Sequence, residues 1–334
     1  MKPKTKDDIY DLLRGQTTIA ALGAALELGL FWLLEKQSME PADVSDALSI
    51  PKNRCIYWMQ LLADLGLLEH TPGGYTPTST AQSAILNAYS EDAWCFLARG
   101  ERERLPLFID LPLHLGDPRS LWAVHGLSAP NYFEQIKHNP ERARRFTYML
   151  YELHQSLAEA IARNIDIGGI NRVLDLGGGS GVISLKLLEC FPSLQATVVD
   201  IPLVCTIGRE IADMTPHRQR IEYISLDFEL DPLPTGFDMV LACDSADPSE
   251  TLFKKIHDIL NPGGHFVIVD QYASNENLVP HERISWAFRS SLGNSDSLWP
   301  PTINEVENMI KEVGFQSNII TRISDDWSMI SSRV

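Results

Sequence analysis

The sequence predicts an α/β fold, with a Rossmann-like, doubly wound and mostly parallel sheet in the C-terminal part and an α-helical, winged-helix-like domain before it. Three observations support this prediction. Short β-branched runs alternate with helical patterns after residue 168, a glycine-rich loop follows the first run, and residues 9–92 show helical periodicity with one hairpin-like turn. Such alternation indicates parallel strands with helices on both faces, because each crossover must return over the sheet.

The N-terminal domain is predicted over residues 1–92. A first helix is broken at Gly29, a second short helix starts at Glu40–Pro41, and a third starts near Pro51. Thr71–Tyr75 then forms a turn between two short extended pieces. Three helices followed by a hairpin-like wing is the element order of a winged-helix domain. The third helix is expected to carry Ile56, Met59, Leu62 and Leu65 inward. One apolar face of the first helix is marked by Ile19, Leu22, Ala25, Leu26, Leu30, Leu33 and Leu34.

A winged-helix order raises the alternative of a DNA-binding regulator. A recognition helix needs basic and amide side chains, yet Lys52 and Arg54 are the cations between Lys52 and Leu68. The chain carries 44 acidic against 28 basic residues, a formal charge of -16, which repels the phosphate backbone. These features favour a packing and dimerisation module over nucleic-acid binding.

Residues 93–165 are predicted to form a helical linker that lines a substrate cleft. Interruptions are expected at Pro106, Pro112, Pro118 and Pro130. Aromatic residues are frequent here, which fits either a core or the wall of a cleft.

The C-terminal domain is predicted over residues 166–334. Strands are expected at 172–176, 195–200, 221–225, 238–242 and 265–270, and helices at 181–191, 204–214, 250–260 and 303–313. Asn261–Gly264 is interpreted as a turn, and the stretches beyond Gly314 as antiparallel edge strands.

The segment from Asp175 to Gly181 is the most specific motif in the chain. Glycines at alternate positions let the backbone approach a ligand, and the following helix N-terminus supplies unpaired N–H groups. A dinucleotide fingerprint would need glycine or alanine where this chain has Val182. A carboxylate at Asp175 suits a cationic ligand, such as one that carries an ammonium and a sulfonium.

Acidic residues also follow the next two predicted strands. Asp200 can accept hydrogen bonds from ribose hydroxyls, while Asp227 and Phe228 can hydrogen-bond to adenine and pack against it. Three acidic positions in register are more specific than a single turn former. The predicted cofactor-binding set is Asp175, Gly177, Gly179, Gly181, Asp200, Ile201, Asp227, Phe228 and Cys243.

With these motifs the chain resembles the class I S-adenosylmethionine-dependent small-molecule O-methyltransferases over nearly its whole length. Their cofactor loop D-x-G-x-G-x-G matches Asp175–Gly181, and residues 24–31 and 65–68 look like their dimerisation domain. Further similarity lies at Asn131–Phe133, Arg145–Phe146, Leu226–Phe228, Leu260–Gly264 and Val313–Phe315. The resemblance implies S-adenosyl-L-methionine as cofactor, a homodimer through the N-terminal domain, and a small-molecule acceptor in a cleft between the domains.

The resemblance fails at the catalytic base. Asp247 stands where the family has its histidine, and Asp244 stands at an earlier family histidine. Three interpretations stay open: a carboxylate base with a raised pKa, an acceptor that needs no strong base, or other chemistry with the same cofactor. An acceptor of the second kind is an activated carbon, an amine or a hydroxyl acidified by conjugation. The leading expectation is methyl transfer to a small aromatic or macrocyclic acceptor. Carbon methyltransferases of the family that act on tetrapyrroles also lack the histidine. Substitutes for it are His281, Glu282, Tyr151 and His154, and no metal site is expected.

The cysteines, the N-terminal residues and the length of the apolar runs indicate the cellular compartment. Five scattered cysteines without a C-x-x-C spacing are interpreted as reduced thiols. The polar N-terminus has no apolar signal core, and no apolar run reaches the roughly 18 residues that a membrane helix needs. A cytoplasmic protein with no membrane partner is therefore expected.

Overall fold

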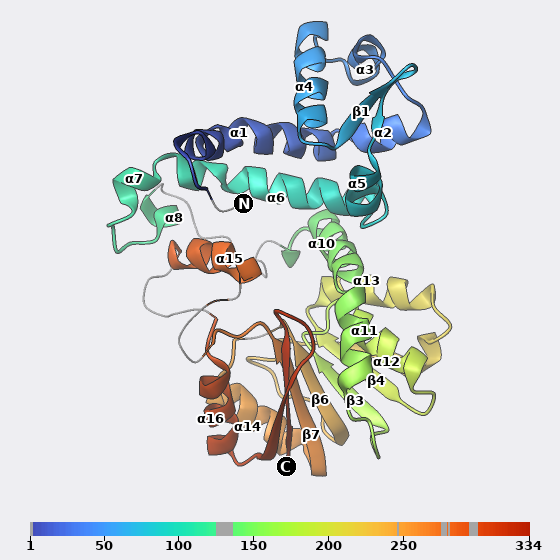
Figure 1. Ribbon diagram of the computed structural model, residues 1–334. Helices are drawn as coiled ribbons and strands as arrows, with labels where there is room; N and C mark the ends of the chain where they lie inside the picture. Colours follow the sequence, from blue (N-terminus) through green and yellow to red (C-terminus); the bar gives the residue numbers. More distant parts are fainter. Residues whose placement is uncertain (1–2, 125–135, 246, 275–278, 280, 294–299) are drawn as a thin grey trace. The chain divides into compact units, whose positions relative to one another are not determined.

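The computed structural model describes residues 3–124, 136–245, 247–274, 279, 281–293 and 300–334; the side chains of residues 281 and 282, and the predicted linker motif Asn131–Phe133, lie outside the described part. The chain divides into two compact units, Met1–Asp110 and Leu111–Val334 (Figure 1).

The first unit begins with the helices and the hairpin in the predicted order. α1 (Lys6–Glu27) starts at a capping box formed by Thr5 and Asp8. Gly29 has φ of 69° and turns the chain into α2 (Leu30–Lys36), because only glycine adopts this backbone without strain. α3 (Pro41–Leu48), α4 (Lys52–Asp64) and a hairpin of β1 (Leu68–Thr71) and β2 (Gly74–Pro77) follow.

The prediction for the inner face of α4 was partly wrong. Met59 and Leu62 are buried as expected, but Ile56 and Leu65 are each 41% exposed and Cys55 is buried in their place. The buried face of α4 therefore consists of Cys55, Met59 and Leu62, which are spaced four and three residues apart. This face is rotated about the helix axis relative to the predicted one.

The first unit ends with α5 (Ser79–Ala81), a π-helical turn (Gln82–Leu86) and α6 (Glu91–Ile109), which packs along α1. The domain boundary predicted after residue 92 falls inside α6. Pro106 also lies inside this helix and does not interrupt it, contrary to the prediction. Arg102 binds Glu27 of α1 through two hydrogen bonds of 2.8 and 2.9 Å and thereby lowers the pKa of that carboxyl.

The second unit starts with the helices α7 (Leu111–His114), α8 (Leu121–Val124), α10 (Pro140–Leu153) and α11 (Gln155–Asn164). Its strands are β3 (Arg172–Leu176), β4 (Gln195–Asp200), β5 (Ile221–Ser225), β6 (Phe237–Cys243), β7 (Leu260–Asp270), β8 (Gln316–Arg322) and β9 (Ser328–Arg333). Between them lie α12 (Val182–Cys190), α13 (Pro202–Asp213), the 3₁₀ turn Arg218–Arg220, α14 (Glu250–Ile259), α15 (His281–Ser291) and α16 (Ile303–Val313).

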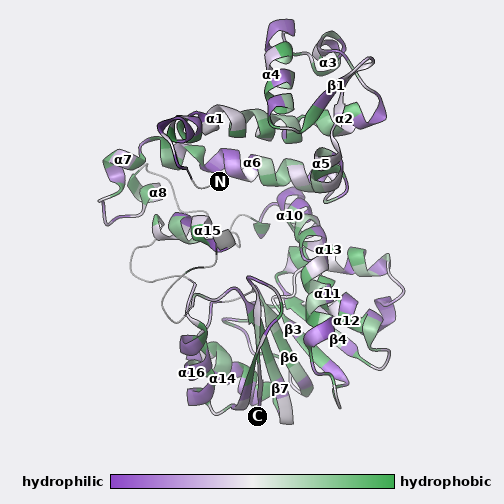
Figure 2. Cartoon of the chain, viewed as in Figure 1, coloured by the Kyte–Doolittle hydropathy of each residue, from purple (hydrophilic) through white to green (hydrophobic). Residues whose placement is uncertain are grey.

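The described strands of this unit form one sheet in the order β5-β4-β3-β6-β7-β9-β8. β3 to β7 pair in parallel, and β9 is antiparallel to both β7 and β8. The sheet separates two apolar clusters, one beneath α11, α12 and α13 and one beneath α14 and α16. Figure 2 shows β3 and β6 as predominantly hydrophobic strands, as expected for a sheet covered on both faces. The predicted Rossmann-like fold is thus confirmed.

One predicted turn has a different structure. Asn261–Gly264 belongs to β7, whose register against β6 shifts so that Phe237 pairs with Leu260 and Met239 with His265. Asn261 Nδ2 donates to Asp238 Oδ1 at 2.8 Å and holds this irregularity in place.

No single helix among the described residues is long and apolar enough to span a bilayer, although α1 and α2 together, bent by 59°, meet the same length and hydropathy test.

Candidate functional site

The glycine loop between β3 and α12 has a backbone that requires glycine. Gly177, Gly179 and Gly181 have φ of 65°, 59° and 78°. A Cβ at Gly181 would lie 2.3 Å from Tyr223 Oη, and one at Gly178 would lie 2.4 Å from Asp175 Cγ. In contrast, no described atom lies within 4 Å of a Cβ placed at Gly179. The loop is therefore packed on its inner side and open at its tip, where a ligand can approach the backbone.

Asp175 lies beneath this loop as a buried carboxylate. Its side chain is 1% exposed, and its Oδ2 accepts a hydrogen bond of 2.7 Å from Ser184 Oγ. Its Oδ1 has no hydrogen-bond partner among the described residues. Burial, and to a smaller extent the charge of Asp200, raise the pKa of Asp175 to about 6. A buried acceptor without a partner costs free energy, so this oxygen fits a polar or cationic ligand group.

Asp200 connects the end of β4 to the same loop. Its Oδ2 accepts the N–H of Gly179 at 2.9 Å, and its Oδ1 accepts the N–H of Ile201 at 2.7 Å. Burial raises the pKa of this carboxyl to about 6, although the two backbone hydrogen bonds oppose the rise. Ile201 is itself buried at the start of α13. The predicted neighbours Gly179, Asp200 and Ile201 therefore do come together.

Phe228 and Ser245 flank Gly177. A Cβ at Gly177 would lie 3.3 Å from Cε1 of Phe228 and 2.6 Å from Cβ of Ser245. Ser245 Oγ is buried without a partner among the described residues. The side chain of Asp227 is used differently. Its Oδ1 caps the following turn by accepting the N–H groups of Glu229 and Leu230. Sequence reasoning missed Ser245, because a serine after a strand carries no distinctive signal.

Cys243 and Asp270 end the neighbouring strands β6 and β7. Burial is the main reason that the pKa of the Cys243 thiol rises well above its usual value, and Asp244, Asp175 and Asp270 add to the effect. The pKa of Asp270 is raised to about 7, first by burial and then by Asp244. Asp270 was not among the predicted residues, although it ends a strand as Asp200 does.

Asp244 is held between two cationic or ionisable side chains from distant elements. Its backbone has φ of 48°, an uncommon conformation for a non-glycine residue. Its Oδ1 accepts a hydrogen bond of 2.9 Å from Arg283 of α15, and its Oδ2 lies 3.9 Å from Nε2 of His154. Arg283 also donates to the side chain of Gln271, and its guanidinium lies 5.6 Å from the centre of the Trp327 ring.

The other predicted catalytic residues are placed less specifically. Asp247 is exposed and has no hydrogen-bond or ion-pair partner among the described residues. The side chains of His281 and Glu282 lie outside the described part. Within that part, no group of three or more His, Cys, Asp or Glu side chains is arranged to hold a metal ion.

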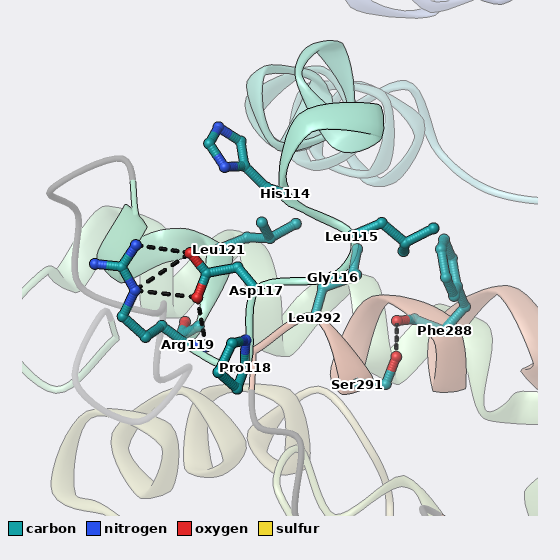
Figure 3. Close-up of a pocket in the computed structure, with 11 residues that line it drawn as sticks. His114, Leu115, Gly116, Asp117, Pro118, Arg119, Leu121, Phe288, Ser291 and Leu292 are labelled. Atoms are coloured by element: carbon teal, nitrogen blue, oxygen red, sulfur yellow. Dashed lines mark hydrogen bonds and ion pairs between the residues drawn. The ribbon is translucent and has the colours of Figure 1, made fainter.

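A cavity of about 270 Å³ lies between α15 and the segment that joins α7 to α8 (Figure 3). Leu115 and Phe288 contribute apolar walls, and the ion pair of Arg119 with Asp117, at 2.6 Å, closes one side. The hydroxyl of Ser120, which also lines the cavity, is buried without a partner among the described residues. None of the lining residues belongs to the glycine loop.

Comparisons with known proteins agree with this geometry. The sequence model of the O-methyltransferase domain matches residues 113–316. The N,N-dimethyltransferase OxyT of Streptomyces rimosus is 26% identical over 322 residues, covering 93% of this chain and 92% of that protein. The 3-hydroxy-5-methyl-1-naphthoate 3-O-methyltransferase of Streptomyces sahachiroi is 28% identical over 244 residues, covering 70% and 66%. The solved structure "PigF with SAH" has the same fold, with a TM-score of 0.85 at 19% identity, covering 99% of this chain and 100% of that one.

Proposed function

Because this chain belongs to the O-methyltransferase family and is an S-adenosylmethionine-dependent methyltransferase, we propose that it methylates a small aromatic or macrocyclic acceptor. The observation that carries the proposal is the unpartnered Oδ1 of buried Asp175, next to a glycine loop that is open at Gly179.

The residues around the loop fit the cofactor. Asp175 offers a carboxylate oxygen to the cationic part of the molecule, and the loop leaves its backbone open to the ligand at Gly179. The N–H groups of Gly177, Gly179 and Gly181 donate within the protein, to Val199 O, Asp200 Oδ2 and Gly178 O. Asp200 and Ile201 are the proposed ribose contacts, and Phe228 and Cys243 are proposed to complete the walls. Asp227, whose Oδ1 caps the following turn, is proposed to contribute from the rim. When bound, the cofactor supplies an electrophilic methyl group on a sulfonium.

The cavity beside α15 is the proposed acceptor subsite. Its size suits one or two aromatic rings, and its lining combines apolar side chains with polar and charged ones, among them His114, Asp117 and Arg119. The hydroxyl of Ser120 provides a hydrogen-bonding group for the acceptor. The relatives named above include an N-methylating and an O-methylating protein, so an amine and a phenol are both suitable acceptor classes.

The proposed chemistry needs little beyond positioning. Methyl transfer from a sulfonium is a direct displacement, in which orientation of donor and acceptor supplies much of the rate. The carboxylates of Asp247 and Asp244, and His281, are the sequence-based candidates to take a proton where the acceptor has one to lose.

We also propose a homodimer that forms through the first unit. α1 exposes large apolar side chains, which water would otherwise solvate at a cost in free energy: Ile9, Tyr10, Leu12, Leu13 and Ile19 are 49–69% exposed. The five cysteines are unpaired, which fits a reducing, cytoplasmic location. The formal charge of -16 disfavours a nucleic-acid partner.

Calorimetry with S-adenosylhomocysteine tests the cofactor site. Wild-type protein should bind it, while Asp175→Ala should weaken binding at least tenfold because the ligand loses its buried carboxylate partner. Asp213→Ala, an exposed carboxylate at the end of α13, is the matched control. Absence of heat and of any thermal shift with wild-type protein at millimolar ligand would refute the proposal.

A further inference from the structure

The end of β6 lies directly beside the cofactor loop. β3 and β6 are neighbouring parallel strands, and Leu176 pairs with Ala242. The loop begins one residue after Leu176, and Asp244 follows two residues after Ala242. Ser245 touches the position of Gly177, so the contact between these two segments is direct. A group held by Asp244 is therefore held next to the loop that receives the methyl donor.

His154 is the histidine that the fold brings to this place. It lies between α10 and α11, 90 positions before Asp244 in the chain, and its side chain is 21% exposed. Its Nε2 lies 3.9 Å from Asp244 Oδ2, a distance for charge pairing but too long for a hydrogen bond. No hydrogen bond to either ring nitrogen is present among the described residues. The imidazole therefore retains a lone pair beside a fixed carboxylate.

On these contacts, and resting on the proposed function, we propose that His154 is the general base of the reaction and that Asp244 is its positioning residue. The acceptor's lone pair forms the new bond to the methyl carbon, and the carbon–sulfur electron pair stays on sulfur. The acceptor's O–H or N–H proton passes to Nδ1 of His154, whose Nε2–H faces Asp244, and the imidazolium pairs with that carboxylate. Release of the proton to solvent restores the neutral ring.

The surrounding charges favour this role. Burial is the largest influence on His154 and lowers its pKa below the usual value, so the ring is neutral and able to accept a proton at neutral pH. The charged groups that face it are Asp244, which raises the pKa, and Arg283, which lowers it; Trp327 contributes an uncharged ring 6.4 Å away. Arg283 already compensates the charge of Asp244, so His154 is not needed for that purpose.

Asp247 is the rival base, and its geometry is weaker. It occupies the family's histidine position, but its carboxylate is exposed and has no orienting partner among the described residues. A base contributes through its orientation, and among the described residues His154 has a neighbouring carboxylate that Arg283 holds in place, while Asp247 has no such neighbour.

Titration of His154 tests the pairing without any acceptor. In protein saturated with S-adenosylhomocysteine and labelled at histidine, the ring signal lost in His154→Gln identifies His154. Its pKa should lie below 6.5 and fall further in Asp244→Asn, because the carboxylate that favours the charged ring is gone. A pKa unchanged in Asp244→Asn would overturn the pairing.

Turnover tests the base, with 3-hydroxy-2-naphthoate and anthranilate as phenol and amine probes. His154→Gln should lower kcat about a hundredfold or more and remove the rise of kcat with pH, while S-adenosylhomocysteine binding stays within twofold. His138→Gln, an exposed histidine of the same unit, is the matched control. Retained activity in His154→Gln, or loss confined to Asp247→Asn, would overturn the proposal. Failure of the proposed function would give a different result, because wild-type protein would then not bind S-adenosylhomocysteine.

Discussion

The hydroxyl of Tyr223 donates a hydrogen bond of 2.9 Å to the carbonyl oxygen of Ser180. Tyr223 belongs to β5 and is buried, and Gly208 of α13 also packs against its ring, where a Cβ would lie only 2.3 Å away. This single side chain therefore fixes the inner side of the glycine loop from two strands away. The position of the cofactor loop depends on a residue that no ligand is expected to touch.

We expect Gly181→Ala and Tyr223→Phe to be strongly coupled. Gly181→Ala adds a Cβ 2.3 Å from Tyr223 Oη and places alanine at φ of 78°, so it should destabilise the protein by roughly 2–4 kcal/mol. Tyr223→Phe alone loses one hydrogen bond, about 1 kcal/mol. In the double variant the clash is relieved while the backbone strain remains.

Denaturant unfolding of the four proteins measures this coupling. The double variant should be more stable than the sum of the single effects by about 1 kcal/mol. Additive effects would show that the loop moves away from Tyr223 instead of meeting it.

The stability of the cofactor-free protein should fall as the pH rises from about 4 to about 7. The pKa values of Asp175 and Asp200 are raised to about 6 and that of Asp270 to about 7, against an ordinary value of 3.8. Each group is protonated in both states at low pH, and ionisation is penalised in the folded state, so its stabilising effect is lost as the pH passes the folded pKa.

Thermal unfolding across this pH range checks the sign of the effect. Asp270→Asn keeps an oxygen that can accept the N–H of Gln271, so it should flatten the profile and raise the melting temperature at pH 8 by a few degrees. An equally steep profile in Asp270→Asn would exclude Asp270 as a cause and leave Asp175, Asp200 and general charge repulsion at a formal charge of -16.

Asp200→Ala should affect both the loop and the ligand. It removes the acceptor for the N–H of Gly179, so the tip of the loop loses its link to β4. We expect S-adenosylhomocysteine affinity to fall about tenfold or more, and amide exchange at Gly179 to accelerate in the cofactor-free protein. If amide exchange at Gly179 is unaltered while binding weakens, Asp200 acts through a direct contact with the ribose and not by positioning the loop.

The local patterns of the second unit were predictable because their physical causes are local. β3, β4 and β5 have the predicted bounds, since each is a short run that contains β-branched residues and is followed by a loop or a helix start. The glycine loop has the backbone that its sequence requires. The inner face of α4 was misjudged because Cys55 and Ile56 are both apolar and differ by one helical step. The contacts of Asp244 with His154 and Arg283 were beyond prediction, since they join three elements distant in the chain.

Leu13→Asp should convert the proposed dimer into monomers. Leu13 is 69% exposed on α1, at helical spacing from Ile9 and close to Leu12, so burial of this face against a second copy would remove several large apolar side chains from water. A carboxylate in the centre of such an interface lacks a partner and costs several kcal/mol for each copy. Sedimentation velocity at micromolar concentration measures the change. Ile319→Asp, at a 62% exposed position on the edge strand β8, is the matched control and should leave the dimer intact. If Leu13→Asp sediments as the wild-type dimer and Ile319→Asp does not, the interface lies on the second unit and α1 is an ordinary solvated helix.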